Sequence, residues 1–166
     1  MHRLYIFALS AVGAMSLLAA FLMPGSGTAT PEVAASAKQV TDPESDALLL
    51  LRDGSGQFHL TARINNNEVE FLVDTGADMV ALTEEEAQGL GIGLSPSDFE
   101  PMMQTASGVG YGARVRLDEF EVAGVLLHDV DAVVVQGLTT NLLGQAVLRQ
   151  LGGIELKGDK MLIHPH

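Results

Sequence analysis

The sequence predicts a mostly β domain with one or two short helices, preceded by an N-terminal transmembrane helix. Three observations lead to this prediction. Short apolar runs recur from about residue 58 onward and are separated by Gly, Asn and Asp, as in strands joined by turns. Two segments carry helix start or stop signals. An uncharged apolar stretch of 20 residues, LYIFALSAVGAMSLLAAFLM, covers residues 4–23.

The N-terminal segment, residues 1–23, is predicted to be a transmembrane anchor or a signal segment. Twenty apolar residues match about 30 Å of hydrocarbon at a rise of 1.5 Å each. A cleaved signal peptide is the alternative, because Gly27-Thr28-Ala29 could form a cleavage site, although an h-region has typically about 7–15 residues. Arg3 favours a cytoplasmic N-terminus. We therefore expect a single-pass protein of the inner (cytoplasmic) membrane with its domain in the periplasm, or a secreted or periplasmic protein after cleavage.

Residues 24–46 are predicted to be a flexible linker, since they are rich in Pro, Ser, Thr and small residues and contain no aromatic residue. The folded domain is assigned to residues 47–166. It has seven Lys and Arg against seventeen Asp and Glu, a formal charge of −10, which argues against nucleic acid as a partner. The chain has no Cys, which excludes disulfides, thiolate metal ligands and a thiol nucleophile.

The first half of the domain reads as a hairpin, a strand and a helix. Residues 58–64 and 68–73 are predicted strands around an Asn65-Asn66-Asn67 turn. A short strand follows at 79–82. Thr83 and the three Glu residues after it indicate a helix start, and Gly89 and Gly91 indicate its end.

The second half begins with a polar loop at residues 93–101. A long hairpin with a Gly-rich tip is then predicted from Met102 to Leu117, followed by strands at 120–122, 125–127 and 130–135. Residues 145–151 fit one or two helical turns. A closing hairpin is expected from 154–156 and 161–163 around residues 157–160.

One motif suggests chemistry. Asp74-Thr75-Gly76 directly follows the apolar run 69–73, so the Asp74 carboxylate is expected on a tight turn at the end of a buried strand. Such a carboxylate is held rigidly near backbone amides, as the activation of water requires. An ordinary turn is the alternative reading, because Asp and Gly are common in turns. Asp78 is interpreted as a solvated residue or a member of a polar network rather than a second catalytic acid.

The chain resembles the retropepsin-type aspartic proteases, in particular a bacterial membrane-anchored branch with a single Asp-Thr-Gly motif. Three stretches carry the resemblance: FLVDTGA at 71–77, TASGVGYGARV at 105–115 and NLLGQAVLRQL at 141–151. It covers roughly residues 57–164. In the last stretch, Gln145-Ala146 replaces a polar pair of the viral members. The resemblance implies a closed β-barrel of the acid-protease half-domain type.

The resemblance also implies site residues and an assembly. Asp74, Thr75 and Gly76 would be the catalytic residues, and Ser107, Gly108, Val109 and Gly110 would form a substrate-binding flap. A chain with one such motif supplies one catalytic carboxylate, so a homodimer would be needed to bring two together.

The leading hypothesis is therefore a homodimeric aspartic endopeptidase that hydrolyses peptide bonds of exported or membrane proteins. A non-catalytic module that binds peptides or dimerises at the membrane is the alternative. No cofactor is expected. No metal site is expected either, because His2, His59, His128, His164 and His166 lie in no HExxH or comparable ligand pattern.

Overall fold

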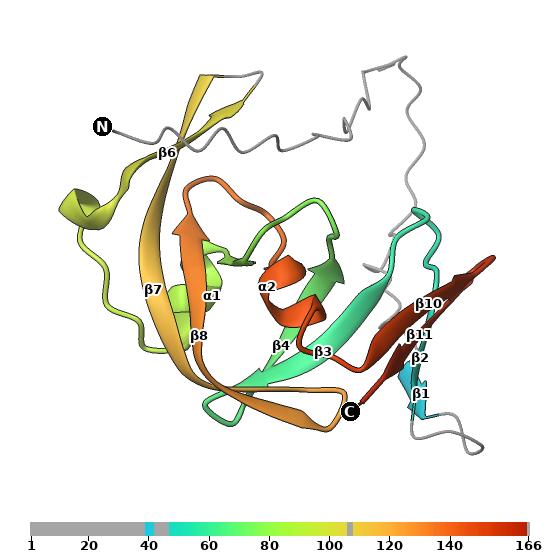
Figure 1. Ribbon diagram of the computed structural model, residues 1–166. Coiled ribbons are helices and arrows are strands. Elements are labelled where there is room, and N and C mark those ends of the chain that lie inside the picture. Colours follow the sequence, from blue (N-terminus) through green and yellow to red (C-terminus); the bar gives the residue numbers. More distant parts are fainter. Residues whose placement is uncertain (1–38, 42–46, 106–107, 166) are drawn as a thin grey trace, which may run out of the picture.

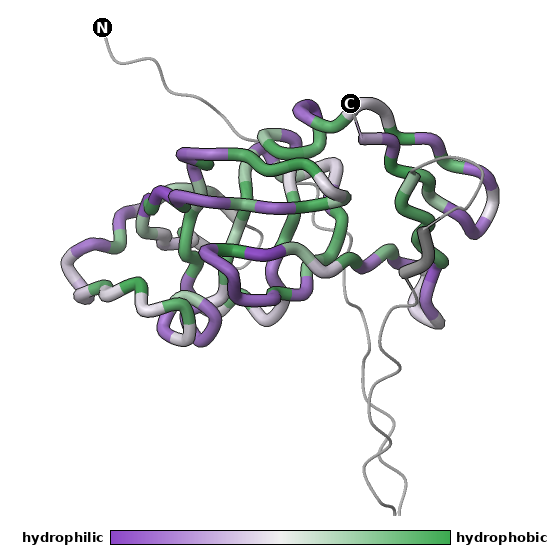
Figure 2. Tube along the Cα trace, turned by 90° about the horizontal axis from the view of Figure 1, so that it is seen from below, coloured by the Kyte–Doolittle hydropathy of each residue, from purple (hydrophilic) through white to green (hydrophobic). Residues whose placement is uncertain are grey.

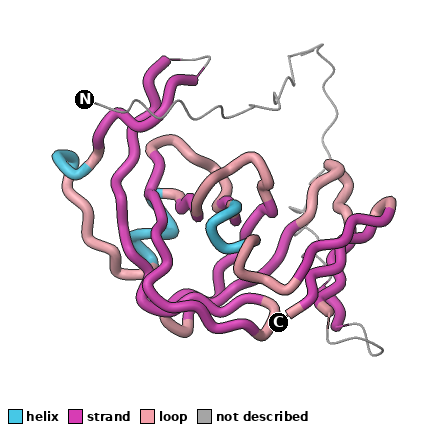
Figure 3. Tube along the Cα trace, in the orientation of Figure 1, coloured by secondary structure: helices cyan, strands magenta, loops and turns pink. Residues whose placement is uncertain are grey.

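The computed structural model describes residues 39–41, 47–105 and 108–165 of the chain (Figure 1). Two sheets account for most of these residues, and helices are few and short (Figure 3). The predicted transmembrane segment, residues 1–23, lies outside the described residues. In the part of the chain that the structure describes, no helix is long and apolar enough to cross a membrane.

The larger sheet closes into a six-stranded barrel. Its strands run in the order β3-β4-β9-β5-β8-β7, and β7 pairs back onto β3, while β6 adds to the outer edge of β7. The predicted mostly β fold with a closed barrel is thereby confirmed. The bounds of these strands are β3 His59–Ile64, β4 Asn67–Val73, β5 Val80–Leu82, β6 Glu100–Thr105, β7 Gly108–Val122, β8 Val125–Val135 and β9 Leu142–Leu143.

Two hairpins of the barrel turn at pairs of residues with positive φ. Asn65 and Asn66, between β3 and β4, both have positive φ, as does the Ala123-Gly124 pair between β7 and β8. Two-residue turns of this kind match the right-handed twist of the flanking strands. The hairpin predicted around the three asparagines is therefore confirmed.

The helices are short. Helix α1 (Glu84–Gly89) begins at Thr83, whose hydroxyl oxygen accepts a hydrogen bond from the Glu86 amide at 3.0 Å. Helix α2 (Gln145–Leu148) has a single turn and follows β9 directly. Both were predicted from the sequence. A 3₁₀ turn, η1 (Pro96–Asp98), lies in the predicted polar loop.

The smaller sheet lies beside the barrel and has the strand order β1-β2-β11-β10. Its bounds are β1 Gln39–Thr41, β2 Leu48–Leu51, β10 Gly153–Lys157 and β11 Lys160–His164. Strands β10 and β11 form the closing hairpin that the sequence predicted. Strand β1 falls inside the segment predicted as a linker; it pairs with β2 and so belongs to this sheet.

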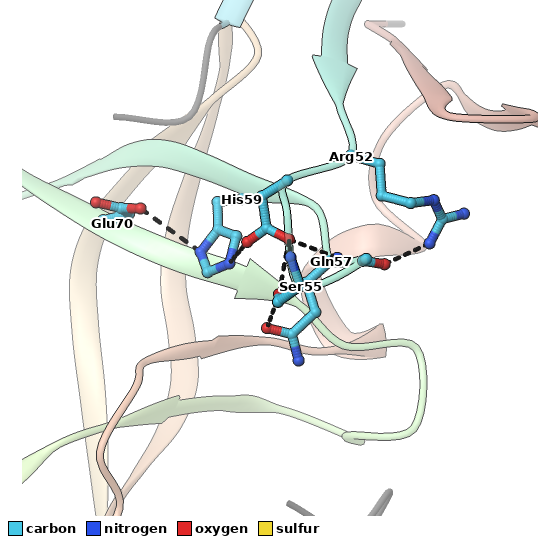
Figure 4. A network of polar contacts seen from close by, with 7 residues as sticks. Arg52, Ser55, Gln57, His59 and Glu70 are labelled. Atoms are coloured by element: carbon cyan, nitrogen blue, oxygen red, sulfur yellow. Dashed lines mark hydrogen bonds and ion pairs between the residues drawn. The ribbon is translucent and has the colours of Figure 1, made fainter. Parts of the chain in front are cut away.

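A polar network joins the two sheets at the loop between β2 and β3 (Figure 4). Asp53 accepts hydrogen bonds from the backbone amides of Ser55 and Gln57, both at 2.8 Å. His59 at the start of β3 lies between two carboxylates, 3.2 Å from Asp53 and 3.5 Å from Glu70 of β4. The network therefore fixes where the small sheet meets the barrel.

The core fills the barrel. Apolar and polar positions alternate along the strands (Figure 2), and in β3 every second residue from Leu60 is buried. Phe71 and Phe120 are fully buried with ring centroids 5.6 Å apart. Leu50, Met161 and Ile163 of the small sheet belong to the same apolar cluster. The two sheets are therefore packed on one continuous core.

Two strands are longer than the sequence predicted. The runs predicted from 113 and at 120–122 belong to one strand, β7, and those at 125–127 and 130–135 belong to β8. Asp129 interrupts the apolar pattern of β8 and has positive φ. The strand nevertheless continues, because pairing resumes on both sides of this residue, from His128 with Glu119 to Val130 with Leu117.

Candidate active site

The Asp74-Thr75-Gly76 motif lies in the loop that connects β4 to β5. Strand β9 is inserted between these two strands and runs parallel to β4, where Leu72 pairs with Leu142 and Val73 pairs with Leu143. It is antiparallel to β5. The loop therefore crosses the end of β9, and residues almost 70 positions apart in the sequence come together at this point.

Hydrogen bonds fix the position of Asp74. Its backbone amide donates to the Leu143 carbonyl at 3.1 Å, and its own carbonyl accepts from the Ala77 amide at 3.2 Å. The Gly76 amide donates to Asp74 Oδ1 at 2.8 Å. Asp74 is half-buried, whereas Thr75 and Gly76 are exposed at the surface of the single chain. The carboxylate is thus held by backbone groups and faces an accessible surface.

Residues at the start of helix α2 hydrogen-bond to the same loop. The backbone amides of Gln145 and Ala146 donate to the carbonyls of Ala77 and Asp78, both at 2.8 Å. The Gln145 side chain adds a bond from Nε2 to the Thr75 carbonyl at 3.0 Å. This approach depends on Gly144, where a β-carbon would meet the carbonyl oxygens of Ala77 and Met79. The Leu142-Leu143-Gly144 element therefore serves to hold the loop.

A cavity of about 120 Å³ adjoins the loop. Its wall is largely apolar and carries two charged residues, Asp78 and Arg114. The loop, β6, β8, β9 and the segment before β9 supply most of the apolar side chains: Met79, Met102, Met103, Val133, Val135, Leu138 and Leu142. A cavity of this composition can take an apolar side chain of a ligand.

The hairpin of β6 and β7 borders this cavity. Gly108, Val109 and Gly110, which were predicted as flap residues, form the start of β7, whereas Ser107 lies outside the described residues. Met102 and Met103 of β6 reach the same cavity as Met79 of the catalytic-motif loop. The structure therefore brings the base of the predicted flap hairpin and the Asp74 loop to one site.

Asn141 is a site residue that the sequence reasoning did not single out. It is 7% exposed, the one polar side chain in the buried class among the described residues. Its Nδ2 donates to the Glu70 carbonyl and to Glu86 Oε2, both at 3.1 Å, and its Oδ1 accepts from the Thr83 amide at 2.9 Å. The signal available in the sequence was an amide residue directly before an apolar strand.

No group of three or more His, Asp or Glu residues suited to a metal ion occurs among the described residues. A second, polar cavity of about 580 Å³ is lined by His59, Glu70, Glu85 and Glu86, together with Asn141. Some of these side chains bind one another or the backbone: His59 lies 3.5 Å from the Glu70 carboxylate, and Asn141 donates to Glu86 and to the Glu70 carbonyl. The predicted catalytic residues Asp74, Thr75 and Gly76 line neither this cavity nor the apolar one, which the following residues of the loop, Ala77, Asp78 and Met79, border.

Relatives of known sequence match most of the chain. "Uncharacterized protein RP867" of Rickettsia prowazekii is 30% identical over 121 residues, which is 73% of this chain and 52% of that protein. "Uncharacterized protein in cobV 5′region" of Sinorhizobium sp. is 28% identical over 160 residues, 95% of this chain and 64% of that protein. The chain thus spans 52% and 64% of the lengths of these two relatives.

Two solved structures share the fold. A retropepsin-like aspartic protease from Rickettsia conorii superposes with a TM-score of 0.59 at 28% identity, covering 70% of this chain and 88% of that one. The EIAV protease, in complex with the inhibitor HBY-793, gives a TM-score of 0.51 and covers 63% of this chain and 97% of its own. At 18% identity, the second likeness shows the fold alone.

The family model described as "gag-polyprotein putative aspartyl protease" matches residues 60–150. This range is more than half of the chain and runs from β3 through α2, so it includes both the Asp74 loop and the helix that supports it. The chain therefore belongs to this family, the retropepsin-like aspartic proteases.

Proposed function

We propose that this protein is an aspartic endopeptidase that acts as a homodimer, with one catalytic carboxylate, Asp74, from each subunit. The observation that carries the proposal is the position of Asp74. It stands at the end of a barrel strand, held by the amides of its own loop and by β9 and α2, beside an apolar cavity. Membership of the aspartic protease family supports the same assignment.

The accessible surface around Asp74 supports the dimer. The motif occurs once in the chain, and the hydrolysis requires two carboxylates. Thr75 and Gly76 are exposed in the single chain, so a second copy can pack against them across a two-fold axis. In that assembly Thr75 would use its hydroxyl across the axis to fix the geometry. Gly76, which has no side chain, would leave the approach open.

The two carboxylates would divide acid and base work between them. Two carboxyl groups about 3 Å apart cannot both be ionised, because their negative charges repel. The pair therefore shares one proton, as is established for aspartic proteases. The ionised carboxylate removes a proton from a bound water, which attacks the scissile carbonyl. The protonated one donates a hydrogen bond to the carbonyl oxygen. No covalent bond to the enzyme forms.

The substrate would be an extended peptide between the Asp74 loop and the β6–β7 hairpin. Such a peptide binds by adding a strand, and its specificity comes from the pockets for alternate side chains. The apolar cavity beside Met79 is suited to one apolar side chain. Closure of the hairpin, whose predicted flap residues are Ser107, Gly108, Val109 and Gly110, would exclude water from the site.

The location is part of the proposal. Residues 4–23 would anchor the domain in the inner (cytoplasmic) membrane and expose it to the periplasm, where exported and membrane proteins are the accessible substrates. Anchoring would also raise the effective concentration of one copy near another, so a weak dimer would suffice for activity. Protease accessibility of the domain in intact and permeabilised cells tests this arrangement.

The decisive experiment compares Asp74→Asn with Asp118→Asn in the full-length chain. Both changes replace a carboxylate by an amide, and Asp118 is exposed on β7 and lines neither the apolar nor the polar cavity. Cleavage of a peptide library between pH 3 and 7 should be lost in Asp74→Asn and retained in Asp118→Asn. Activity per mole should also fall on dilution of detergent-solubilised protein, because the dimer dissociates.

Wild-type cleavage by Asp74→Asn would refute the assignment. The alternative, a peptide-binding module without activity, predicts that neither the wild type nor Asp74→Asn cleaves any peptide while both bind the same ones. A fully active monomer would refute the shared site.

A further inference from the structure

The peptide unit between Thr75 and Gly76 is hydrogen-bonded at both of its ends. Its carbonyl oxygen, on Thr75, accepts a bond from Gln145 Nε2 at 3.0 Å. Its amide, on Gly76, donates to Asp74 Oδ1 at 2.8 Å. The side chain of Gln145 and the carboxylate of Asp74 therefore bind opposite ends of one planar group.

A further bond orients Gln145. Arg149 Nε donates to Gln145 Oε1 at 3.3 Å, from one helical turn further along the chain. Since the guanidinium can only donate, the amide oxygen of Gln145 points to Arg149 and its NH₂ group points to the Thr75 carbonyl. The contacts form one chain from Arg149 through Gln145 and the Thr75–Gly76 peptide to Asp74.

The Gln145 side chain is not needed to attach α2 to the loop. The backbone amides of Gln145 and Ala146 already bind the carbonyls of Ala77 and Asp78, and Gly144 allows the close approach. These contacts persist whatever side chain stands at position 145. The additional side-chain bond therefore acts on the orientation and polarity of the Thr75–Gly76 peptide.

We propose that Gln145, oriented by Arg149, is a positioning residue that stabilises the ionised form of Asp74 through the Thr75–Gly76 peptide. Hydrogen bonds in a chain polarise one another, so an acceptor bond at the carbonyl strengthens the donor at the other end. A stronger Gly76 donor favours the carboxylate over the carboxylic acid. This role rests on the proposed function of Asp74 as the catalytic acid and base.

The charged groups around the loop are few. Asp78 lies on the loop itself, Arg149 at the end of α2, and Arg114 on β7 at the wall of the adjoining cavity. Asp74 forms no ion pair within the described ranges 39–41, 47–105 and 108–165. Among the described residues, the Gly76 amide is the hydrogen-bond donor to this carboxylate, and Gln145 acts on the peptide that carries it.

The test is the titration of the Asp74 carboxyl carbon, followed by NMR in the full-length wild type, in Gln145→Leu and in Gln150→Leu. The midpoint compared is that of the step at lower pH, at which the coupled pair loses its first proton. Gln145→Leu keeps the size of the side chain and removes the donor. Its titration midpoint should rise, because the Gly76 donor is weakened when the acceptor bond at the other end of the peptide is lost. Gln150 Nε2 donates to the Ala146 carbonyl at 2.8 Å and not to the Thr75 carbonyl, so Gln150→Leu should leave the midpoint unchanged.

Two further variants test the hydrogen bond from Arg149 to Gln145. Arg149→Met should raise the midpoint by less than Gln145→Leu does, because Gln145 keeps its donor but loses its orientation. Arg149→Lys retains the positive charge, so it shows how much of this effect is due to charge. If Gln145→Leu does not fold, the proposal is tested by comparing the Asp74 titration midpoints of Arg149→Met and Arg149→Lys.

In active enzyme, the acid limb of the pH–rate profile should move to higher pH in Gln145→Leu, with kcat lowered more than KM is raised. An unchanged midpoint in folded Gln145→Leu, or an equal rise in Gln150→Leu, overturns the proposal. The NMR readout does not depend on cleavage. An inactive wild type whose Asp74 midpoint still responds to Gln145→Leu would reject the protease assignment and retain this one.

Discussion

Gly144 lies so close to Met79 that a β-carbon added to it would stand 2.3 Å from the Met79 carbonyl oxygen. The same atom would be 2.7 Å from the carbonyl oxygen of Ala77. Both obstacles are backbone atoms of the loop that carries Asp74, so neither can move aside without moving the loop. The glycine of the apolar-apolar-Gly element is therefore required by the close packing of α2 on the catalytic motif.

Gly144→Ala should consequently destabilise the protein and impair catalysis together. Forcing a methyl group into this contact is expected to lower the free energy of unfolding by about 3 kcal/mol. Chemical denaturation measures the loss. Gly89→Ala is the matched control: no atom lies within 4 Å of its added β-carbon, and Ala at the end of α1 should be neutral or slightly stabilising. Equal stability of the two variants would contradict the packing argument.

Asn141 is expected to be a second structural determinant of the site. Replacing it with Leu removes the partners of the Thr83 amide and the Glu70 carbonyl, and an unsatisfied buried polar group costs about 1–3 kcal/mol. The free energy of unfolding should therefore fall by about 2–4 kcal/mol. Thr140→Ala, at the exposed neighbouring position, should change it by less than about 0.5 kcal/mol. Similar values for the two variants would refute the role of Asn141.

The local elements of this fold could be predicted from the sequence, because their causes are local. The three asparagines at 65–67 predicted the β3–β4 turn, and Thr83 with the following glutamates predicted the start of α1. Asp74 was placed correctly directly after a strand, although only Val69 and Phe71 of that strand are buried. These features depend on the conformational preferences of a few adjacent residues.

The long-range contacts of the site could not be predicted in the same way. Leu142-Leu143 was recognised as an apolar pair, but nothing in its composition indicates that β9 inserts between β4 and β5. The roles of Asn141 and Gln145 follow from that insertion, since it brings them to residues 55–71 positions away. Isolated polar residues that lie this far apart in the sequence form no periodic pattern, so their contact cannot be inferred from the sequence.

Asp53 gives the protein a pH-dependent stability. A hydrogen bond from the Ser55 hydroxyl, followed by bonds from backbone amides and by the nearby His59, lowers the pKa of the Asp53 carboxyl to about 2. In the unfolded chain the group titrates near its ordinary value of about 3.9. The unfolded state thus binds more protons between these values. The contribution is fully present above about pH 4 and is lost as the pH falls toward 2.

Asp53→Asn should therefore cost stability at pH 5 and cost progressively less as the pH falls from about 4 to 2. Urea denaturation of both proteins at a series of pH values measures this difference. Asp159→Asn is the control, because the Asp159 side chain is 89% exposed in its ion pair with Arg52 and such pairs contribute little. A difference between wild type and Asp53→Asn that is the same at all pH values would contradict the linkage.

The contact of Gly112 with Met102 predicts a change of specificity. A β-carbon on Gly112 would lie 2.8 Å from Met102 Sδ and 2.7 Å from Val133 Cγ2. Met102 is flexible and can yield by moving into the cavity, whereas Val133 is β-branched and the Val134 carbonyl oxygen, 3.2 Å from the added atom, is backbone. Gly112→Ala should therefore lose some stability and have a smaller cavity. Under the proposed function, KM for peptides with a large side chain at this position should rise about tenfold, the order of effect expected for one methylene group in an apolar pocket.

Peptides with Ala or Val at the same position should be affected less, because a smaller cavity still holds them. Gly93→Ala provides the comparison, since its added β-carbon meets no atom within 4 Å and Gly93 does not line the apolar cavity. Steady-state kinetics on a series of peptides that differ only in the size of one side chain distinguish the two variants. A uniform loss for all sizes in Gly112→Ala would mean that the cavity does not select the side chain, whereas a size-dependent loss assigns it to substrate recognition.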